Sequence, residues 1–410
     1  MIEYKKAQKI LSDSKIKIRN ETIFTKNSLN RVSAKNIFSP TNCPAGNNTA
    51  FDGYALNSRD TIGLSSKSKK KFRILKTIAA GDKPIIKNVK KYSTVEIMTG
   101  ALIPKNFDTI IPVEKINYLS NKKFIIVKEK IKKNNHVRFA GSDYKKGEKV
   151  VSTGEIINSS HILAFKSLGI NKIVVKKKPL IVFYSTGNEI SEKNNIPDWK
   201  IRNSNSHYIK ALSNNSFFKI VDGGILRDKD DKLFSKLISK SFKSKCDIII
   251  TNGAVSAGKF DFVPRVVKNF KLSNYFKGVA IRPGKPILFA KFKNKEKSFF
   301  GLPGNPISSA ACFKFFVYPY LRLILNMKRE KPFKAKLKNR YEKKNNFTKF
   351  LKGKISINNK GVLEIKVLKG QESFRIKSFT KANVWGFFRS GKSAFKKGEL
   401  IECFNPLGVQ

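Results

Sequence analysis

The chain has 410 residues, which is too long for one hydrophobic core and predicts roughly two to four domains. Its formal charge of +55 comes from 84 lysine and arginine residues against 29 acidic residues. These cations are spread through every segment, whereas a dedicated nucleic-acid binder concentrates them on one arm or helix. We therefore disfavour a nucleic-acid partner, although a field this positive should attract anionic ligands of any size.

The four cysteines and three histidines are scattered and form no CxxC pair, which argues against a disulfide framework and against a zinc or histidine-based metal site. The first residues contain no apolar core of signal-peptide length. The longest apolar run, residues 307–325, is broken by Lys314 and Arg322. We therefore expect a cytoplasmic protein with no membrane span.

In chain order, apolar residues at helical spacing predict a first helix within residues 4–18. Short alternating runs between residues 49 and 131, separated by Gly, Pro and Asn, predict a small β domain. Residues 137–151 are an extended connector. Asn158 is then placed to cap a helix that ends at Gly169.

From residue 179, strand-like and helix-like segments alternate, and the strands are apolar throughout. This pattern predicts a parallel sheet covered on both faces. Residues 330–410 return to short strands with glycine turns. The expected fold is therefore multidomain α/β, with a central three-layer α/β domain and a mostly parallel sheet. A small β domain, an extended linker domain and a C-terminal β domain flank it.

Three of the expected strands end in unusual loops, at residues 185–189, 251–261 and 301–306. Ligands of open α/β sheets bind beyond the carboxyl ends of the strands, so the three loops should share one rim. Their glycines bring the backbone close to a ligand and offer N–H groups to an anion. Each loop taken alone is also compatible with a plain connection.

Glu189 and Asp261 are acids on two of these loops, in a chain where acids are scarce. Carboxylates on adjacent loops suit one divalent cation that bridges phosphate oxygens. Alternatively, each carboxylate caps a helix or pairs with a lysine. The sequence contains neither a Walker lysine motif nor GxGxxG, which disfavours ordinary NTPase and Rossmann chemistry.

Eight motifs, in this order, resemble the molybdopterin molybdenumtransferase family, which includes bacterial enzymes and the gephyrin E domain. They are NTAFDGYAL, EIMTGALIPKNFDTIIPVE, VRFAGSDYKKGE, STGNEI, SNSHYIKAL, TNGAVSAGKFDF, RPGKP and GLPGNPISS. The resemblance implies insertion of molybdate into adenylylated molybdopterin (molybdopterin-AMP), with Mg²⁺ and release of AMP, as the last step of molybdenum cofactor synthesis. It also implies an elongated homodimer whose substrate is supplied by a molybdopterin adenylyltransferase.

The same resemblance implies four domains. An elongated linker domain comprises residues 1–40 and 141–177, and a small β domain comprises residues 41–140. An α/β molybdopterin-binding domain covers residues 178–327, and a C-terminal β-barrel-like domain covers residues 328–410. The active cleft would lie between the α/β domain of one subunit and the small β domain of its partner.

Residue roles carried over by motif fall into two groups. Catalytic roles are implied for Asp52, Thr99 and Asp143 on the partner side, and for Glu189, Asp228 and Asp261 on the α/β side, with Glu189 and Asp261 as metal ligands. Substrate-binding roles are implied for Ser185, Thr186, Gly187, Ser204, Asn205, Gly253, Ser256, Gly258, Lys277, Arg282, Pro283, Gly284, Lys285, Pro303, Gly304, Asn305, Lys352 and Ser373. Among these, Lys277, Arg282 and Lys285 would hold pterin phosphate or molybdate, and Lys352 and Ser373 would face the oxyanion.

Four positions depart from the family pattern. Ala254 stands where a second glycine is usual, Lys259 where an acid is usual, Asn203 where Asp is common, and Lys352 where Arg is expected. A lysine cannot form the bidentate fork that arginine forms on an oxyanion. None of the four positions removes a proposed metal carboxylate.

Two alternatives belong to other functions. An adenylyltransferase would share the α/β domain and its loops, but such chains usually lack the flanking β domains. A scaffold or basic nucleic-acid-binding protein would have no use for a cleft lined by acids. We therefore expect no specific nucleic-acid partner and no membrane partner.

Overall fold

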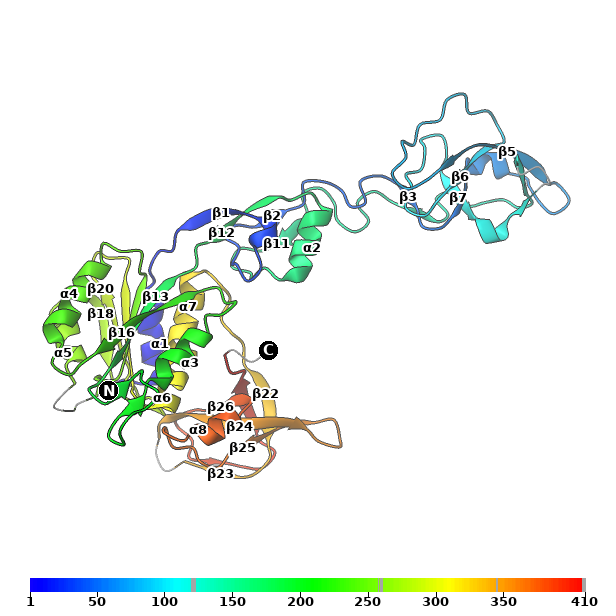
Figure 1. The fold of residues 1–410 in the computed structure, drawn as a ribbon. Helices are drawn as coiled ribbons and strands as arrows, with labels where there is room; N and C mark the ends of the chain where they lie inside the picture. The colour runs from blue at the N-terminus through cyan, green and yellow to red at the C-terminus, as the bar shows by residue number, and fades with distance from the viewer. Residues whose placement is uncertain (119–122, 257, 259–260, 344–345, 408–410) are drawn as a thin grey trace.

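A computed structural model describes residues 1–118, 123–256, 258, 261–343 and 346–407. The molecule is elongated: the central sheet and the C-terminal strands lie at one end, and a small sheet lies at the far end of a long arm (Figure 1). None of the described helices is both long and apolar enough to cross a membrane. The fold class is the expected multidomain α/β class.

The central sheet has six strands in the order β16-β13-β17-β21-β20-β18. The first four pair in parallel, and β20 and β18 add in antiparallel fashion, so the sheet is mixed at one edge. The prediction of apolar, covered strands holds for β17 and β21 but is wrong for β16, an edge strand whose residues are mostly exposed. The strands are β13 (Leu180–Thr186), β16 (Lys219–Leu226), β17 (Ile248–Asn252), β18 (Leu272–Lys277), β20 (Leu288–Phe292) and β21 (Ser298–Leu302).

Helices cover both faces of this sheet, which makes three layers (Figure 1). On one face α4 and α5 enclose a core that includes Phe234, Val263 and Phe299. On the other face α1, α3, α6 and α7 enclose a larger core that includes Ile209, Phe289 and Phe316. The helices are α1 (Tyr4–Ser12), α3 (Ser204–Ala211), α4 (Asp231–Ser241), α5 (Val263–Lys268), α6 (Pro306–Cys312) and α7 (Tyr318–Ile324).

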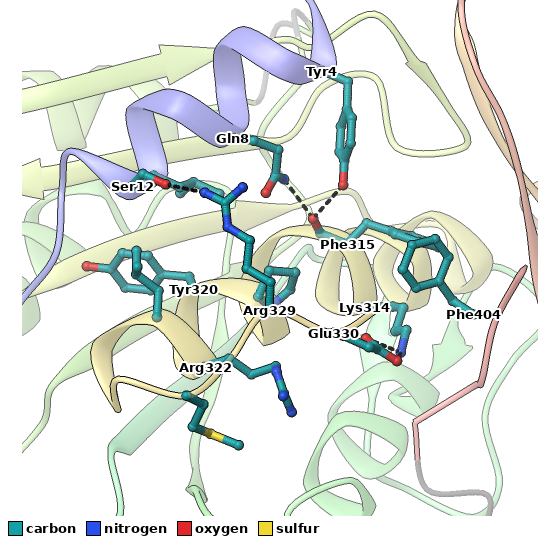
Figure 2. A pocket seen from close by; sticks show the side chains of 14 residues that line it. Tyr4, Gln8, Ser12, Lys314, Phe315, Tyr320, Arg322, Arg329, Glu330 and Phe404 are labelled. Carbon is teal, nitrogen blue, oxygen red and sulfur yellow. Dashed lines mark hydrogen bonds and ion pairs between the residues drawn. The ribbon is translucent and has the colours of Figure 1, made fainter. Parts of the chain in front are cut away.

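The first helix is confirmed but ends at Ser12, and it is fastened to a π-helical segment, Phe313–Val317, between α6 and α7. Pro319 has no N–H to give to the carbonyl four residues earlier, that of Phe315. The Tyr4 hydroxyl (3.4 Å) and Gln8 Nε2 (2.9 Å) donate to that carbonyl instead (Figure 2). Two side chains of α1 thus supply the donors for a helix carbonyl that lies more than 300 residues away in the sequence.

The arm is built from paired two-stranded segments and one helix. The helix α2 (Ser159–Ser167) begins with the predicted cap: Asn158 Oδ1 accepts from the backbone N–H of His161 at 2.9 Å. Gly169 then takes the left-handed conformation with φ +73°. The strands pair as β1 (Asn20–Phe24) with β12 (Lys172–Lys176), β2 (Ile37–Phe38) with β11 (Lys149–Val151), and β3 (Asn48–Thr49) with β10 (Val137–Arg138).

The small sheet at the end of the arm has the order β7-β4-β6-β5-β9-β8. Its central strands are buried on both sides, because two apolar clusters, one around Phe72 and one around Val95, pack against it. The strands are β4 (Gly53–Leu56), β5 (Lys70–Ile78), β6 (Ser93–Ile97), β7 (Thr109–Pro112), β8 (Asn117–Tyr118) and β9 (Phe124–Val127).

The C-terminal strands close on themselves in the order β24-β25-β22-β28-β26 and back to β24, which makes a small barrel. A short strand from the RPGKP segment, β19 (Ile281–Arg282), pairs with β24 and ties the barrel to the α/β layer. The elements are β22 (Phe333–Leu337), β23 (Tyr341–Glu342), β24 (Thr348–Ile357), β25 (Leu363–Val367), α8 (Ile376–Thr380), β26 (Val384–Phe388), β27 (Ala394–Phe395) and β28 (Leu400–Phe404).

Candidate functional site

A cavity of 580 Å³ lies at the carboxyl ends of β13, β17 and β21. Residues from all three glycine-bearing loops line it, together with the start of α3. Of the residues singled out from the sequence, the lining contains Thr186, Gly187, Glu189, Ser204, Asn205, Asp228, Gly253, Ser256, Asp261, Pro303, Gly304 and Asn305. Glu189 and Asp261 therefore share one cavity.

Two asparagine side chains hold the loops together. Asn252 Nδ2 donates to the Pro303 carbonyl at 2.7 Å and to Ser309 Oγ at 2.9 Å. Asn205 Nδ2 donates to Asn252 Oδ1 and to the Gly304 carbonyl, both at 2.7 Å. Side-chain hydrogen bonds thus fix the start of α3 and the loops after β17 and β21 to one another. Asn252 was not singled out from the sequence, although it directly precedes the glycine of TNGA.

The β13 loop is held by a residue that the sequence gave no reason to choose. Arg227 Nη1 donates to the backbone carbonyls of Gly187 (3.0 Å) and Ile190 (2.9 Å), so it fixes the conformation of the loop. A Cβ on Gly187 would collide with the Glu189 carboxylate. This position therefore needs glycine for Glu189 to lie over the backbone and line the cavity.

Asp261 is anchored in its own loop through one oxygen. Its Oδ2 accepts from the Gly258 N–H at 2.7 Å, and its own N–H donates to the Gly258 carbonyl at 3.0 Å. An adjoining cavity of 540 Å³ shares Ser256 and Asp261 and brings in Lys277, whose Nζ donates to the Ser256 carbonyl at 2.6 Å. Gly258 and Lys277 belong to this adjoining cavity, and Asp261 stands between the two. Lys259 lies outside the described residues.

The glycine turn after β17 contains a strained non-glycine residue. Gly253 has φ +102°, and a Cβ there would lie 2.6 Å from Thr186 Oγ1. The next residue, Ala254, has φ +52°, in the left-handed region that costs an L-residue roughly 1–2 kcal/mol. This is a physical reason for the second glycine that is usual at this position.

Other residues chosen from the sequence lie behind the cavity wall. Ser185 is buried and its Oγ donates to Asn203 Oδ1 at 2.7 Å, so it supports the wall. In the RPGKP segment Pro286 lines the cavity, whereas Arg282, Pro283, Gly284 and Lys285 do not. Arg282 instead lies in the strand that pairs with the barrel.

Lys352 is buried, and its ammonium group is fully occupied. Nζ donates to the carbonyls of Gly370 (2.7 Å), Glu372 (3.3 Å) and Arg375 (3.1 Å), which uses all three of its donors. Burial lowers the pKa of this ammonium to about 8. In this structure Lys352 therefore orients the 370–375 loop and has no donor left for an oxyanion.

Ser373, at the centre of that loop, reaches the cavity rim. Its Oγ accepts from Asn305 Nδ2 at 3.0 Å, and its carbonyl accepts from the Ile307 N–H at 3.0 Å. The barrel thus contacts the GLPGNP turn directly, through the loop that Lys352 holds.

Asp52, Thr99 and Asp143 lie away from this cavity. Asp52 and Thr99 are on the small sheet at the far end of the arm (Figure 1), where the Thr99 N–H and Oγ1 donate to Asp52 Oδ1 at 2.6 and 2.7 Å. The backbone bond and then the hydroxyl bond lower the pKa of this exposed carboxyl. Asp143 is exposed on the connector. Within one chain, these three residues do not meet the cavity.

No ready-made metal cage is present in the part of the chain that the structure describes: no group of three or more His, Cys, Asp or Glu side chains could hold an ion there. The cavity offers Glu189, Asp228 and Asp261 as separate carboxylates. Such hard oxygen donors suit Mg²⁺, which keeps several waters and takes one or two protein carboxylates together with substrate phosphates. The donor set therefore fits Mg²⁺ bound jointly with a substrate.

Three family models match the chain: "MoeA N-terminal region (domain I and II)" at residues 2–169, "Probable molybdopterin binding domain" at residues 183–323, and "MoeA C-terminal region (domain IV)" at residues 334–404. The molybdopterin molybdenumtransferase of Staphylococcus aureus strain COL is 30% identical over 386 residues, which are 93% of this chain and 90% of that protein. That of Staphylococcus epidermidis strain ATCC 12228 is 29% identical over 406 residues, 98% and 94% of the two chains.

The fold comparison agrees with these matches. Two crystal structures of the molybdopterin biosynthesis MoeA protein from Pyrococcus horikoshii superpose with TM-scores of 0.84 and 0.83, at 26% and 25% identity. The first covers 100% of both chains, and the second covers 98% of this chain and 99% of the other. The chain therefore belongs to the molybdopterin molybdenumtransferase family.

Proposed function

We propose that this enzyme inserts molybdate into adenylylated molybdopterin, with Mg²⁺ and with release of AMP, in the last step of molybdenum cofactor biosynthesis. The observation that supports this most is the cavity at the carboxyl ends of β13, β17 and β21. It combines the carboxylates of Glu189 and Asp261 with glycine-bearing turns held by Asn205 and Asn252. Both substrates are anions, and Glu189 and Asp261 offer a place for a cation beside them. The N–H groups of Gly187, Gly253 and Gly258 are bonded within the protein, so these glycines contribute close approach of the backbone rather than donors.

Glu189 and Asp261 would hold Mg²⁺, with Asp228 close by on the same lining. When bound, the ion would reduce the repulsion between the phosphate groups of one substrate and the molybdate oxygens. The chain's own contribution is alignment. Asn205 and Asn252 fix the turns before any substrate arrives, so little reorganisation is needed at the moment of reaction.

Lys277 is proposed to bring in the second anion. Its Nζ is held at the Ser256 carbonyl in the adjoining cavity, which shares Asp261 with the main one. A phosphate or molybdate in the adjoining cavity would therefore lie next to the carboxylate that holds the cation. Ser373 contacts the cavity rim through its hydrogen bond with Asn305, and Lys352 holds the loop that contains Ser373. We propose no direct oxyanion contact for Lys352.

The remaining implied residues are proposed to come from a second copy of the chain. Asp52 and Thr99 are exposed next to strands of the small sheet, and among the described residues the Asp52 carboxylate has no hydrogen-bond partner besides Thr99. A homodimer in which each arm reaches the partner's cavity would complete two sites. The four-domain division given above, the supply of substrate by an adenylyltransferase and a cytoplasmic location are part of the same proposal.

The direct test supplies the purified protein with adenylylated molybdopterin, molybdate and Mg²⁺ and measures AMP. We expect release that requires both molybdate and Mg²⁺, and a loss on the order of 100-fold in Asp261→Asn. Asp261→Asn keeps the side-chain shape, so nucleotide binding should survive. Wild-type turnover in this variant would remove Asp261 from the mechanism. Adenylylation of molybdopterin from ATP would instead indicate an adenylyltransferase.

The shared site is tested by mixing two inactive variants. Asp52→Asn has an intact cavity, and Asp261→Asn has an intact arm. Random re-association of equal amounts should restore about a quarter of wild-type activity, since half of the dimers are mixed and each has one complete site. No recovery, with mixed dimers shown to be present, would contradict a site shared between subunits.

A further inference from the structure

A second large cavity, of 660 Å³, lies at the opposite edge of the central sheet, where β13, β17 and β21 begin. Four segments line it: residues 17–19, residue 177, the loop 242–247 before β17, and the turn 294–297 before β21. It shares no residue with the candidate site at the carboxyl ends. The proposed reaction gives it no role.

The lining of this cavity is far more basic than the chain as a whole. Seven of its 13 lining residues are lysine or arginine, whereas 84 of all 410 residues are. Random scatter of a lysine-rich composition therefore does not explain it. The seven cations are Lys17, Arg19, Lys177, Lys243, Lys245, Lys295 and Lys297.

The two acids in the lining offset only part of this charge, and Asp247 interacts electrostatically with Lys297, Lys177 and Arg19. Asp247 Oδ2 accepts from the Leu180 N–H at 2.8 Å, and Glu296 Oε2 accepts from the Lys17 N–H at 2.6 Å. Both carboxylates thus serve the backbone. Among the ion pairs within 4.0 Å that the described residues form, none involves any of the seven cations. With seven cations against two acids, the concave lining therefore keeps an excess of positive charge, although Lys297 Nζ also donates to the Ser244 carbonyl at 3.0 Å.

We propose that this cavity binds a compact run of phosphate groups, such as inorganic triphosphate or the triphosphate of a nucleotide. A multivalent anion can approach several lysines at once, and a concave site focuses their field on it. The volume lies within the range of small-ligand sites. Nucleic acid is disfavoured, because a phosphate backbone is recognised along an extended basic stripe rather than inside a cavity of this size.

The position gives such a ligand a mechanical consequence. Residues 17–19 and 177 are the two points where the arm joins the α/β layer, directly before β1 and directly after β12. The loops 242–247 and 294–297 belong to the sheet. An anion held by both sets would therefore cross-link the root of the arm to the sheet and restrict how the arm, with Asp52 at its far end, is oriented.

Calorimetric titration with inorganic triphosphate, in about 150 mM salt to suppress nonspecific attraction, tests the proposal. The cavity variant is Lys177→Gln/Lys245→Gln. The matched control, Lys67→Gln/Lys69→Gln, removes the same charge from an exposed loop of the small sheet. We expect the wild type and the control to bind triphosphate equally. The cavity variant should bind at least about tenfold more weakly at one site, because two of seven cations are removed.

Equal weakening in the two double variants, or no triphosphate binding by the wild type, would overturn the proposal. Because the candidate site is itself proposed to bind phosphate, the number of bound triphosphates is counted, and the cavity variant should lose one. ATP that binds as tightly as triphosphate would assign recognition to the phosphates alone, and tighter ATP binding would add a contact to the nucleoside. Displacement of triphosphate by single-stranded RNA at lower concentration would replace the proposal with nucleic-acid binding.

Hydrogen exchange provides a readout independent of affinity. Triphosphate should slow the exchange of backbone amides in residues 13–19 and 172–179 in the wild type and in the control variant. The same segments should be unaffected by triphosphate in Lys177→Gln/Lys245→Gln. Protection confined to the loops at the carboxyl ends of the strands would place the triphosphate in the candidate site and contradict a second site.

Discussion

The cavity of the α/β layer and the small sheet at the end of the arm both contain residues chosen from the sequence, but they use them differently. In the cavity, Asn252 is buried and bonded to partners on three segments. On the small sheet, Asp52 is exposed, and in the interactions of the described residues its carboxylate is bonded to Thr99 alone. The polar side chain in the cavity is bonded within its own fold, whereas the small sheet presents an exposed carboxylate.

This difference separates stability from function. A residue that holds a preformed cavity contributes to both, because its partners are the walls of the site. A residue presented to a second molecule contributes to activity only, since folding gains little from it. Variants in the two regions should therefore behave in distinct ways, and each prediction below tests whether they do.

The largest effect is expected for Asn252→Ala. It leaves the Pro303 carbonyl and Ser309 Oγ without their donor in a buried place, which should lower the free energy of unfolding by about 2–4 kcal/mol. AMP release should fall on the order of 10- to 100-fold, because the loops lose their alignment. Chemical denaturation and the AMP assay measure the two effects.

Asn358→Ala provides a matched control for that prediction. Asn358 Oδ1 accepts from the Lys360 and Val362 N–H groups in a barrel turn, both at 3.0 Å, far in sequence from the cavity loops. It should lose stability and keep its activity once folded. If Asn252→Ala instead left activity unchanged, the cavity would not be the site.

The next largest effect is expected for Asp52→Asn, and it should fall mainly on activity. We expect a loss of AMP release on the order of 10- to 100-fold, with a thermal midpoint that falls far less than that of Asn252→Ala. Thr99→Val should show the cause through pH. The Thr99 bonds lower the pKa of Asp52, so removing the hydroxyl raises that pKa towards its ordinary value. The acid limb of the activity profile should then move to higher pH.

A thermal midpoint that falls as far in Asp52→Asn as in Asn252→Ala would contradict the separation of the two regions. The sign of any stability change can also be checked. A carboxyl with a lowered folded-state pKa contributes stability above its unfolded pKa and loses it as the pH falls through the folded value. Any difference between Asp52→Asn and the wild type should therefore vanish in strong acid.

Ala254→Gly should produce a smaller effect of opposite sign. It relieves the left-handed conformation at φ +52°, and the entropy that glycine adds to the unfolded chain offsets part of the gain. The net change should be a stabilisation of about 0.5–1 kcal/mol, with activity retained. A destabilised Ala254→Gly protein would mean that the methyl group is held by contacts worth more than the strain.

The last effect is confined to alkaline pH and concerns Lys352. Burial lowers its pKa to about 8, so the folded state releases this proton before the unfolded chain does. The unfolded state binds more protons between pH 8 and about 10.4, and stability therefore rises with pH in that window. Relative to Lys352→Met, the wild type should gain stability from pH 8 to pH 10. A constant difference would show that the ammonium stays charged on its three carbonyls.

Much of the local structure follows from the sequence. The Asn158 cap, the Gly169 stop, the strand and helix alternation after residue 179, and the glycine turns at the strand ends are all present as expected. Each depends on residues within a few positions of one another, where dihedral preference and side-chain period act directly. The prediction failed for β16, because whether a strand lies at an edge depends on which strands pair with it.

By itself, therefore, the sequence determined the elements, the mixed α/β class and the loops on which a site could form. Only the tertiary structure decided which of those residues meet. Asn205 donates to the Gly304 carbonyl 99 positions away, and Lys352 donates to carbonyls of the 370–375 loop. Asp52 is not among the residues that line the cavity. Local preferences are decided over a few residues, whereas these contacts exist only after distant segments have packed, since burial is what fixes the partner of each polar group.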